Sequence, residues 1–332
     1  MIFIENTAYI KEHFNESDLY IFAIGYEHRS YYFYDQVLLK LNSLNTLLFV
    51  FDDYEDYNYA SRKISEIKKC NCKIERVHYS DHQDVQKKII KTIVDMIATN
   101  DSITVHIDYS SMPRSWYCRL PILLKDVLRE NDRVHFWYSE GQYPESREEY
   151  PSAGIEDFSF FSGKPSLQID NSRVHILALG YDVVRTEAIV SITDPSVLVA
   201  CYAYNPVRQE RQERIKIVNN HLLSRAAMSL ALRLDDFSFM VSKMCDTANE
   251  LLATGDVILI PDGPKPLIFA ISLVPDLLNK PGITCLHVAR NKMHFKPVDV
   301  TPTGVIYGFS IRIISKEFAP PPALCVTREQ CC

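Results

Sequence analysis

Long hydrophobic runs are missing from this sequence. No apolar segment approaches 18 residues, and the N-terminal stretch MIFIENTAYIKEHFNE is interrupted by charges. A membrane-spanning helix needs about 20 apolar residues, and a secretory leader needs a basic start followed by an apolar stretch. The sequence therefore predicts neither, and we expect a cytoplasmic protein with no membrane partner.

The motifs of the common cofactor and metal sites are also missing. No G-x-G-x-x-G follows a predicted strand and no Walker A sequence is present, so we expect neither the usual NAD or SAM binding nor P-loop NTPase activity. The nine cysteines contain no pair of C-x-x-C units and no Cys/His set with zinc-finger spacing. Their odd number fits reduced intracellular thiols. We therefore predict no metal site and no cofactor.

An excess of positive charge is absent as well. The 332 residues carry a formal net charge of -6, with 47% hydrophobic and 23% charged residues. This composition is typical of a globular protein with a real core, and it argues against a nucleic-acid polymer as the partner. The length suggests two domains or one large α/β body.

In the first half of the chain, short apolar runs alternate with helical patterns. The expected strands cover 19–25, 45–53, 72–80, 102–108 and 133–139, and the expected helices cover 30–43, 57–69, 81–100 and a segment that begins at Ser115. This βαβαβαβαβ order predicts a parallel sheet with helices on both faces. Residues 141–171 are rich in Pro, Gly, Ser and charge, and we interpret them as a connector.

The pattern begins again after the connector. Expected strands at 173–182, 196–206, 226–236 and 256–266 repeat those of the first half, and a helix at 237–254 matches the one at 81–100. Gly25 and Asp108 are 83 positions apart, and Gly180 and Asp262 are 82 apart. Self-similarity at an offset of about 155 residues indicates two copies of one unit.

We therefore predict an α/β protein of two tandem Rossmann-like, three-layer units with mostly parallel sheets. The first unit is expected at 1–140 and the second at 172–318, with antiparallel strands added near the C-terminus. Residues 319–332 are expected to form a flexible tail.

Ligands of open parallel sheets bind beyond the carboxyl ends of the strands. Four segments fall there: GYEHR at 25–29, DYSSMPR at 108–114, GYD at 180–182 and DGPK at 262–265. A turn with serine or glycine, followed by a helix N-terminus and a cation, suits an anion such as phosphate. The candidate ligand-binding residues are Gly25, Tyr26, Arg29, Ser110, Ser111, Arg114, Gly180, Tyr181, Asp262, Gly263 and Lys265.

A purely structural interpretation of these segments stays open. Asp108, Ser110 and Ser111 have the side chains that cap helices, so they would serve the helix that follows. Gly25 and Gly180 would then be glycines of tight turns. The tyrosines of the same segments offer rings on which a nucleobase can stack, which favours the ligand interpretation.

The layout resembles the CARF and SAVED families, Rossmann-like sensors of cyclic oligonucleotides and related second messengers in prokaryotic defence. Gly25-Tyr26-Glu27 and Gly180-Tyr181-Asp182 stand where CARF domains carry their first loop, and 108–114 and 262–265 stand where they carry their second. The resemblance implies two fused units and a nucleotide-type phosphate ligand, cyclic oligonucleotides included, in a cleft between the repeats. It also implies a role in antiviral defence signalling.

Three functions follow as alternatives. The first is a binding module that senses a nucleotide-like molecule and reports it to a protein partner or to a second copy of the chain. The second is a hydrolase or glycosyl-transferring enzyme acting on a nucleotide or sugar phosphate, with Glu27 or Asp108 as base or nucleophile. The third is a structural subunit of a defence complex.

Overall fold

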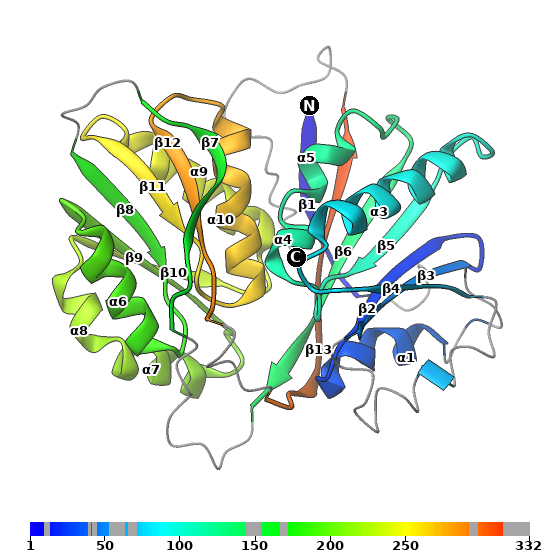
Figure 1. Ribbon diagram of the computed structural model, residues 1–332, viewed down its shortest axis with the longest axis horizontal. Coiled ribbons are helices and arrows are strands. Elements are labelled where there is room, and N and C mark those ends of the chain that lie inside the picture. Colours follow the sequence, from blue (N-terminus) through cyan, green and yellow to red (C-terminus); the bar gives the residue numbers. More distant parts are fainter. Residues whose placement is uncertain are drawn as a thin grey trace, which may run out of the picture. The chain divides into compact units, whose positions relative to one another are not determined.

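The computed structural model describes residues 1–9, 14–38, 41, 45–52, 64–65, 72–143, 154–166, 172–291 and 298–314. These residues form two compact units, each with its own sheet. The first unit contains 1–143 together with 298–314, and the second contains 154–291 (Figure 1). The predicted fold class of two Rossmann-like α/β units is confirmed.

The sheet of the first unit has seven strands in the order β1-β13-β6-β5-β2-β3-β4. Its strands are β1 (Ile2–Thr7), β2 (Leu19–Ile24), β3 (Asn45–Phe51), β4 (Cys72–Val77), β5 (Thr104–Asp108), β6 (Arg133–Gln142) and β13 (Thr301–Ile313). The strands from β6 to β4 run parallel, whereas β13 pairs antiparallel with both β6 and β1.

Helices cover both faces of this sheet. On one face, α1 (Tyr32–Leu38) follows the short 3-10 helix η2 (His28–Tyr31), and its buried side chains pack on Phe22 and Leu48. The opposite face carries α3 (His82–Ile97), α4 (Arg114–Tyr117) and α5 (Leu120–Leu124), with Trp116 packed on Phe49. The helix expected at 81–100 is α3, and its apolar side chains Val85, Ile89 and Ile93 are buried against the sheet. The core lies between these layers because strand side chains alternate between the two faces.

The second sheet has six strands in the order β10-β9-β8-β11-β12-β7. Its strands are β7 (Phe158–Lys164), β8 (Arg173–Ala178), β9 (Val197–Tyr204), β10 (Met228–Arg233), β11 (Asp256–Ile260) and β12 (Ile283–Val288). Its helices are α6 (Val183–Thr193), α7 (Gln209–Val218) and α8 (Asn220–Arg225) on one face, with α9 (Phe237–Leu251) and α10 (Lys265–Leu278) on the other (Figure 1). Only β7 is antiparallel to its neighbour.

The two sheets share one topology, which confirms the internal duplication at the level of the fold. In each unit the chain builds three strands outward in one direction, β2-β3-β4 or β8-β9-β10, and then returns to the other side with β5-β6 or β11-β12. The direction of strand addition therefore reverses between β2 and β5, and between β8 and β11. Loops at such a switch point diverge and leave room for a ligand.

The sequence predicted that the C-terminal strand belongs to the second unit, and this prediction is wrong. Residues 301–313 form β13, which lies in the first sheet between β1 and β6. Aromatic packing explains its position, because Phe309 stacks on Phe136 with ring centroids 4.9 Å apart and Gly308 makes room for the Trp137 ring. The expected connector is also partly wrong, since β7 lies within it and joins the second sheet. The expected tail at 319–332 lies outside the described residues.

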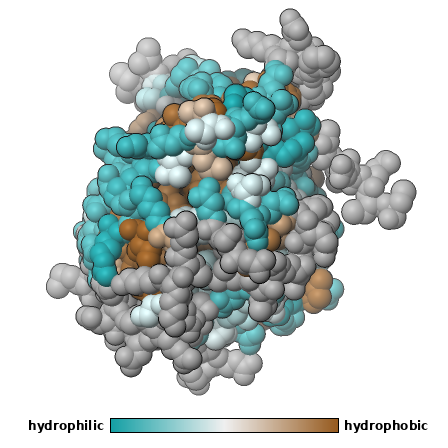
Figure 2. Space-filling model, turned by 90° about the vertical axis from the view of Figure 1, so that its right-hand side faces the viewer, coloured by the Kyte–Doolittle hydropathy of each residue, from teal (hydrophilic) through white to brown (hydrophobic). Residues whose placement is uncertain are grey.

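The single helix expected from Ser115 is two short helices, α4 and α5. Pro121 lies in the first turn of α5, where its missing N–H costs nothing, and it separates the two helices. The expected helix at 57–69 lies outside the described residues except for 64 and 65. Within the described part of the chain, the helices are too short or too polar to cross a bilayer. The face in Figure 2 is mostly hydrophilic where it is coloured, with hydrophobic atoms in small areas.

Candidate functional site

Gly25 follows β2 at the switch point of the first unit. Its φ is not in the left-handed region, and a Cβ added there would lie 3.6 Å from Ser111 Oγ and 3.7 Å from the Phe51 ring. These are ordinary contact distances. The fold therefore does not require glycine here, and the edge has room for at least a methyl group.

Ser111 lies in the turn after β5 and faces this space. Its Oγ is buried and has no hydrogen-bond partner among the described residues. A buried hydroxyl without a partner costs free energy, on the order of 1–3 kcal/mol. The Ser111 hydroxyl therefore makes no hydrogen bond within the part of the fold that the structure describes.

Asp108 and Ser110 build the turn itself. The Oδ1 atom of Asp108 accepts hydrogen bonds from Ser110 N–H at 2.8 Å and from Ser110 Oγ at 2.5 Å, and Ser110 Oγ accepts one from Ser139 N–H at 2.7 Å. The expected capping role is wrong, because α4 begins at Arg114 and has Pro113 as its N-cap, without a side-chain cap. Asp108 and Ser110 thus hold the loop that presents Ser111.

Arg29 is the buried cation of this edge. Its Nε donates to Glu27 Oε2 at 2.5 Å and its Nη1 donates to Tyr138 Oη at 2.9 Å, while its side chain is 5% exposed. Burial lowers the pKa of this guanidinium, but Glu27 and Tyr138 outweigh burial and hold that pKa above its ordinary value. Arg29 is therefore a permanent, fixed positive charge.

One nitrogen of Arg29 remains available. No described residue accepts a hydrogen bond from Nη2, which carries two N–H groups. A guanidinium presents its donors in a planar fork that matches phosphate or carboxylate oxygens. Glu27 and Tyr138 accept hydrogen bonds from Nε and Nη1, and they thereby fix the orientation of Nη2.

The corresponding arginine of the second unit, Arg185, has a protein acceptor at each of its three nitrogens. Its Nε donates to both carboxylate oxygens of Asp262 at 3.1 and 3.0 Å, and its Nη2 donates to Val288 O at 2.7 Å. Its Nη1 donates to the carbonyl oxygens of Gly154 and Ala289. Every nitrogen of this guanidinium therefore has at least one protein acceptor, and Arg185 has no counterpart of the acceptor-free Nη2 of Arg29.

The glycines of the second unit are packing residues. A Cβ on Gly263 would lie 2.9 Å from Leu179 O, and one on Gly180 would lie 3.2 Å from Asp262 O. Asn219 donates from Nδ2 to Gly180 O at 2.9 Å, and its own Oδ1 is buried without a partner among the described residues. That atom is an acceptor and cannot bind an anion. The second edge is therefore closed where the first has space.

The remaining predicted residues lie at the two edges and have interactions within the fold. Tyr26 and Tyr181 are half-buried, and Arg214 lies over the Tyr181 ring with its Cζ 5.4 Å from the centroid. Arg114 begins α4 and Lys265 begins α10, and both are half-buried. The sequence thus located the loops of both units correctly.

Arg185 is the buried loop arginine that the sequence patterns did not single out. The signal was present, because GYEHR at 25–29 and GYDVVR at 180–185 both place an arginine shortly after Gly-Tyr-acid. The one-residue difference in spacing hides the match. Both arginines are almost fully buried, at 4% and 1% exposure, which a charged surface loop does not predict.

The two carboxylates considered for catalysis have structural contacts. Glu27 binds Arg29, and Asp108 organises the turn to Ser110. His28 lies next to Glu27 and pairs through Nδ1 with Asp299 Oδ2 at 2.6 Å. These contacts give each acid a role in the fold.

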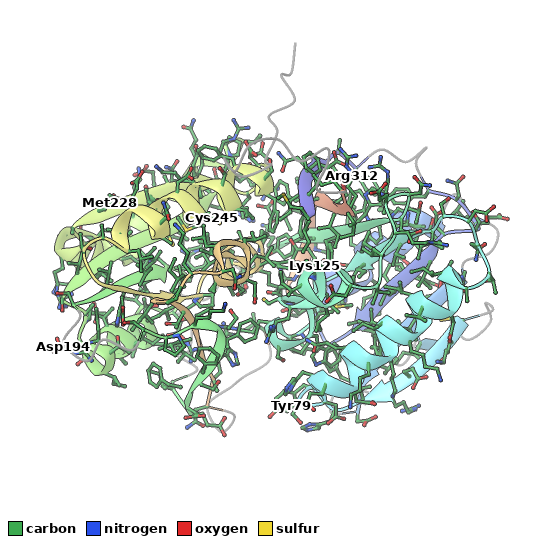
Figure 3. The ribbon with its side chains drawn as sticks, turned by 90° about the horizontal axis from the view of Figure 1, so that it is seen from above. Tyr79, Lys125, Asp194, Met228, Cys245 and Arg312 are labelled. Carbon is green, nitrogen blue, oxygen red and sulfur yellow. The ribbon has the colours of Figure 1, made fainter. Side chains whose placement is uncertain are left out.

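The cysteines have no metal-binding arrangement in the part of the chain that the structure describes. That part contains no group of three or more His, Cys, Asp or Glu side chains placed for a metal ion. Cys245 lies on α9 (Figure 3), and burial raises the pKa of its thiol to about 12. Such a thiol stays protonated and is a core residue.

Comparison with known proteins leaves the chain without an assigned family. No family model and no curated protein matches it. Among solved structures, it is similar to the crystal structure of the cytoplasmic domain of a prokaryotic cation chloride cotransporter, at 10% identity and a TM-score of 0.25. The match covers 83% of this chain and 96% of the other. At this TM-score the likeness carries no argument about function.

Proposed function

We propose that the first unit binds a nucleotide-type ligand at the carboxyl edge of its sheet and that the chain is a sensor of this ligand. The observation that carries the proposal is the buried Arg29 guanidinium, held by Glu27 and Tyr138 with Nη2 lacking an acceptor among the described residues. A phosphate oxygen is the acceptor that this group matches best.

The neighbouring groups suit the rest of such a ligand. The Ser111 hydroxyl can donate to a phosphate or ribose oxygen, and Gly25 lets a ligand approach the backbone closely. Tyr26 lies beside Gly25 and provides a ring for stacking. Glu27 compensates the charge of Arg29, so the edge is selective for an anion that also makes polar contacts rather than for negative charge alone.

The test is native mass spectrometry of freshly purified protein, followed by thermal-shift and calorimetric titration with mononucleotides, dinucleotides and cyclic oligonucleotides. We expect one class of these ligands to bind and to raise the Tm. Arg29→Gln should weaken its binding about 10- to 100-fold, since hydrogen bonds to charged groups contribute about 1.5–3 kcal/mol.

Arg225→Gln is the matched control. Arg225 is exposed on α8 in the second unit, so its loss removes the same charge without touching the edge. Equal binding by the wild type and both variants, or no binding by any nucleotide in the panel, would show that the edge has only a structural role.

A further inference from the structure

The chain passes twice between its two units. The outgoing crossing runs from Tyr143 in the first unit to Gly154 in the second. The returning crossing runs from Asn291 in the second unit to residue 298 in the first. The residues that flank these two crossings are therefore the parts of each unit through which the units are joined covalently. The two buried arginines lie against these flanking residues.

In the first unit, the segment that carries Arg29 is attached to both flanks. The Arg29 N–H donates to Val300 O at 3.0 Å, and the His28 N–H donates to Asp299 Oδ1 at 3.1 Å. A Cβ on Gly141 would lie 2.9 Å from Arg29 Nη1 and would also collide with Val300, so these three residues pack without a gap. Gly141 is on the outgoing strand and pairs with Pro302 on the returning one.

In the second unit, Arg185 contacts both flanks directly. It donates to the carbonyl oxygen of Gly154 on the incoming flank and to those of Val288 and Ala289 on the outgoing flank. The same two flanks are joined by backbone bonds between Glu156 N–H and Ala289 O and between Ala289 N–H and Asp157 O, at 3.0 and 2.8 Å. In each unit, the arginine of the loop after the first strand of the repeat, β2 or β8, thus contacts the flanks of both crossings.

We infer that the two units have diverged in their use of one arginine. Both arginines contact the residues that flank the chain crossings, but only Arg29 has a nitrogen without an acceptor among the described residues, so the chain binds one phosphate-bearing ligand and not two. Because this ligand binds the residue that packs on Gly141 and Val300, its binding stabilises the flanks of both crossings in the first unit, at 138–143 and 298–304. This inference rests on the proposed function and adds its stoichiometry and its route of signalling.

The experiment is hydrogen–deuterium exchange of the full chain in inorganic phosphate, compared with chloride at equal ionic strength. Phosphate should slow exchange several-fold in peptides covering 138–143 and 298–304, and it should leave peptides covering 154–157 and 286–291 unchanged. Native mass spectrometry should find a single phosphate per chain. Arg29→Gln should abolish the slowing.

Asp299→Asn is the second variant, because it weakens the return crossing without touching the guanidinium. It should speed exchange at 298–301 and still bind phosphate. Two phosphates per chain, slowing at 154–157, or phosphate bound at Arg29 with unchanged exchange at 298–304 would each overturn the inference alone. An absence of phosphate binding would overturn the proposed function and the inference together.

Discussion

At the scale of single residues, Gly25 and Gly263 show how the two edges differ. A Cβ at Gly25 meets only ordinary contacts, whereas one at Gly263 would lie 2.9 Å from the Leu179 carbonyl oxygen. Packing therefore does not require a glycine at position 25, whereas it does require one at position 263. The sequence marks both as glycines after strands and cannot distinguish these reasons, which depend on the neighbouring strand.

We predict that Gly25→Ala leaves the free energy of unfolding unchanged or raises it by up to about 1 kcal/mol, because alanine restricts the unfolded chain. Gly263→Ala should lower it by about 1–3 kcal/mol, because the added methyl group must displace backbone. Urea denaturation of the two variants measures both values. Similar losses of stability would contradict the space that the structure places at Gly25.

Ser111→Ala should separate binding from stability. Removing a buried hydroxyl that has no partner should keep or increase the free energy of unfolding, while a ligand that uses this hydroxyl should bind less tightly. Thermal unfolding and calorimetry on the same variant measure the two effects. A large loss of stability would mean that the Ser111 hydroxyl already has a structural partner.

At the scale of elements, the sequence predicted most strands because apolar periodicity is local. The apolar patterns of their own residues placed β2, β3, β5, β8, β11 and the helix α3. They did not place β13, whose position depends on Phe309 meeting Phe136 across 173 positions of the chain. The pairing of Arg185 with Asp262 was missed for the same reason, since the two lie 77 residues apart.

The buried pair of Arg185 and Asp262 should make a large contribution to the stability of the second unit. Arg185→Met leaves the Asp262 carboxylate buried without its partner and should lower the free energy of unfolding by about 3–5 kcal/mol. The double variant with Asp262→Asn should recover part of this loss, since it removes the uncompensated charge. A double-mutant cycle with no coupling energy between the two positions would contradict a stabilising ion pair between Arg185 and Asp262.

At the scale of the whole molecule, stability should depend on two buried histidines. Burial lowers the pKa of His106, with Asp18 opposing, and burial together with Arg173 lowers the pKa of His175 to about 4. Trp137 donates to His106 Nδ1, so the neutral ring donates from Nε2 to Asp18. Both rings are neutral in the folded chain at pH 7.

The two neutral histidines contribute fully to the free energy of unfolding above about pH 6.5, the pKa of a histidine in the unfolded chain. This contribution is lost as the pH falls toward the lower pKa of the folded chain, because the unfolded chain takes up protons first. Each histidine adds a slope of up to about 1.4 kcal/mol per pH unit in this range. His175→Gln should flatten the difference between pH 7 and pH 5. Parallel stability curves for the wild type and the variant would contradict the buried neutral ring.

The central claim is that the first unit keeps a guanidinium face for phosphate and that the second does not. The most direct measurement is side-chain ¹⁵N NMR of arginine-labelled protein during a titration with inorganic phosphate, with signals assigned by Arg29→Lys and Arg185→Lys. We expect the Nη signals of Arg29 to shift and to exchange more slowly with solvent, while those of Arg185 stay fixed and protected throughout. A shift at Arg185, or none at Arg29, would contradict this claim.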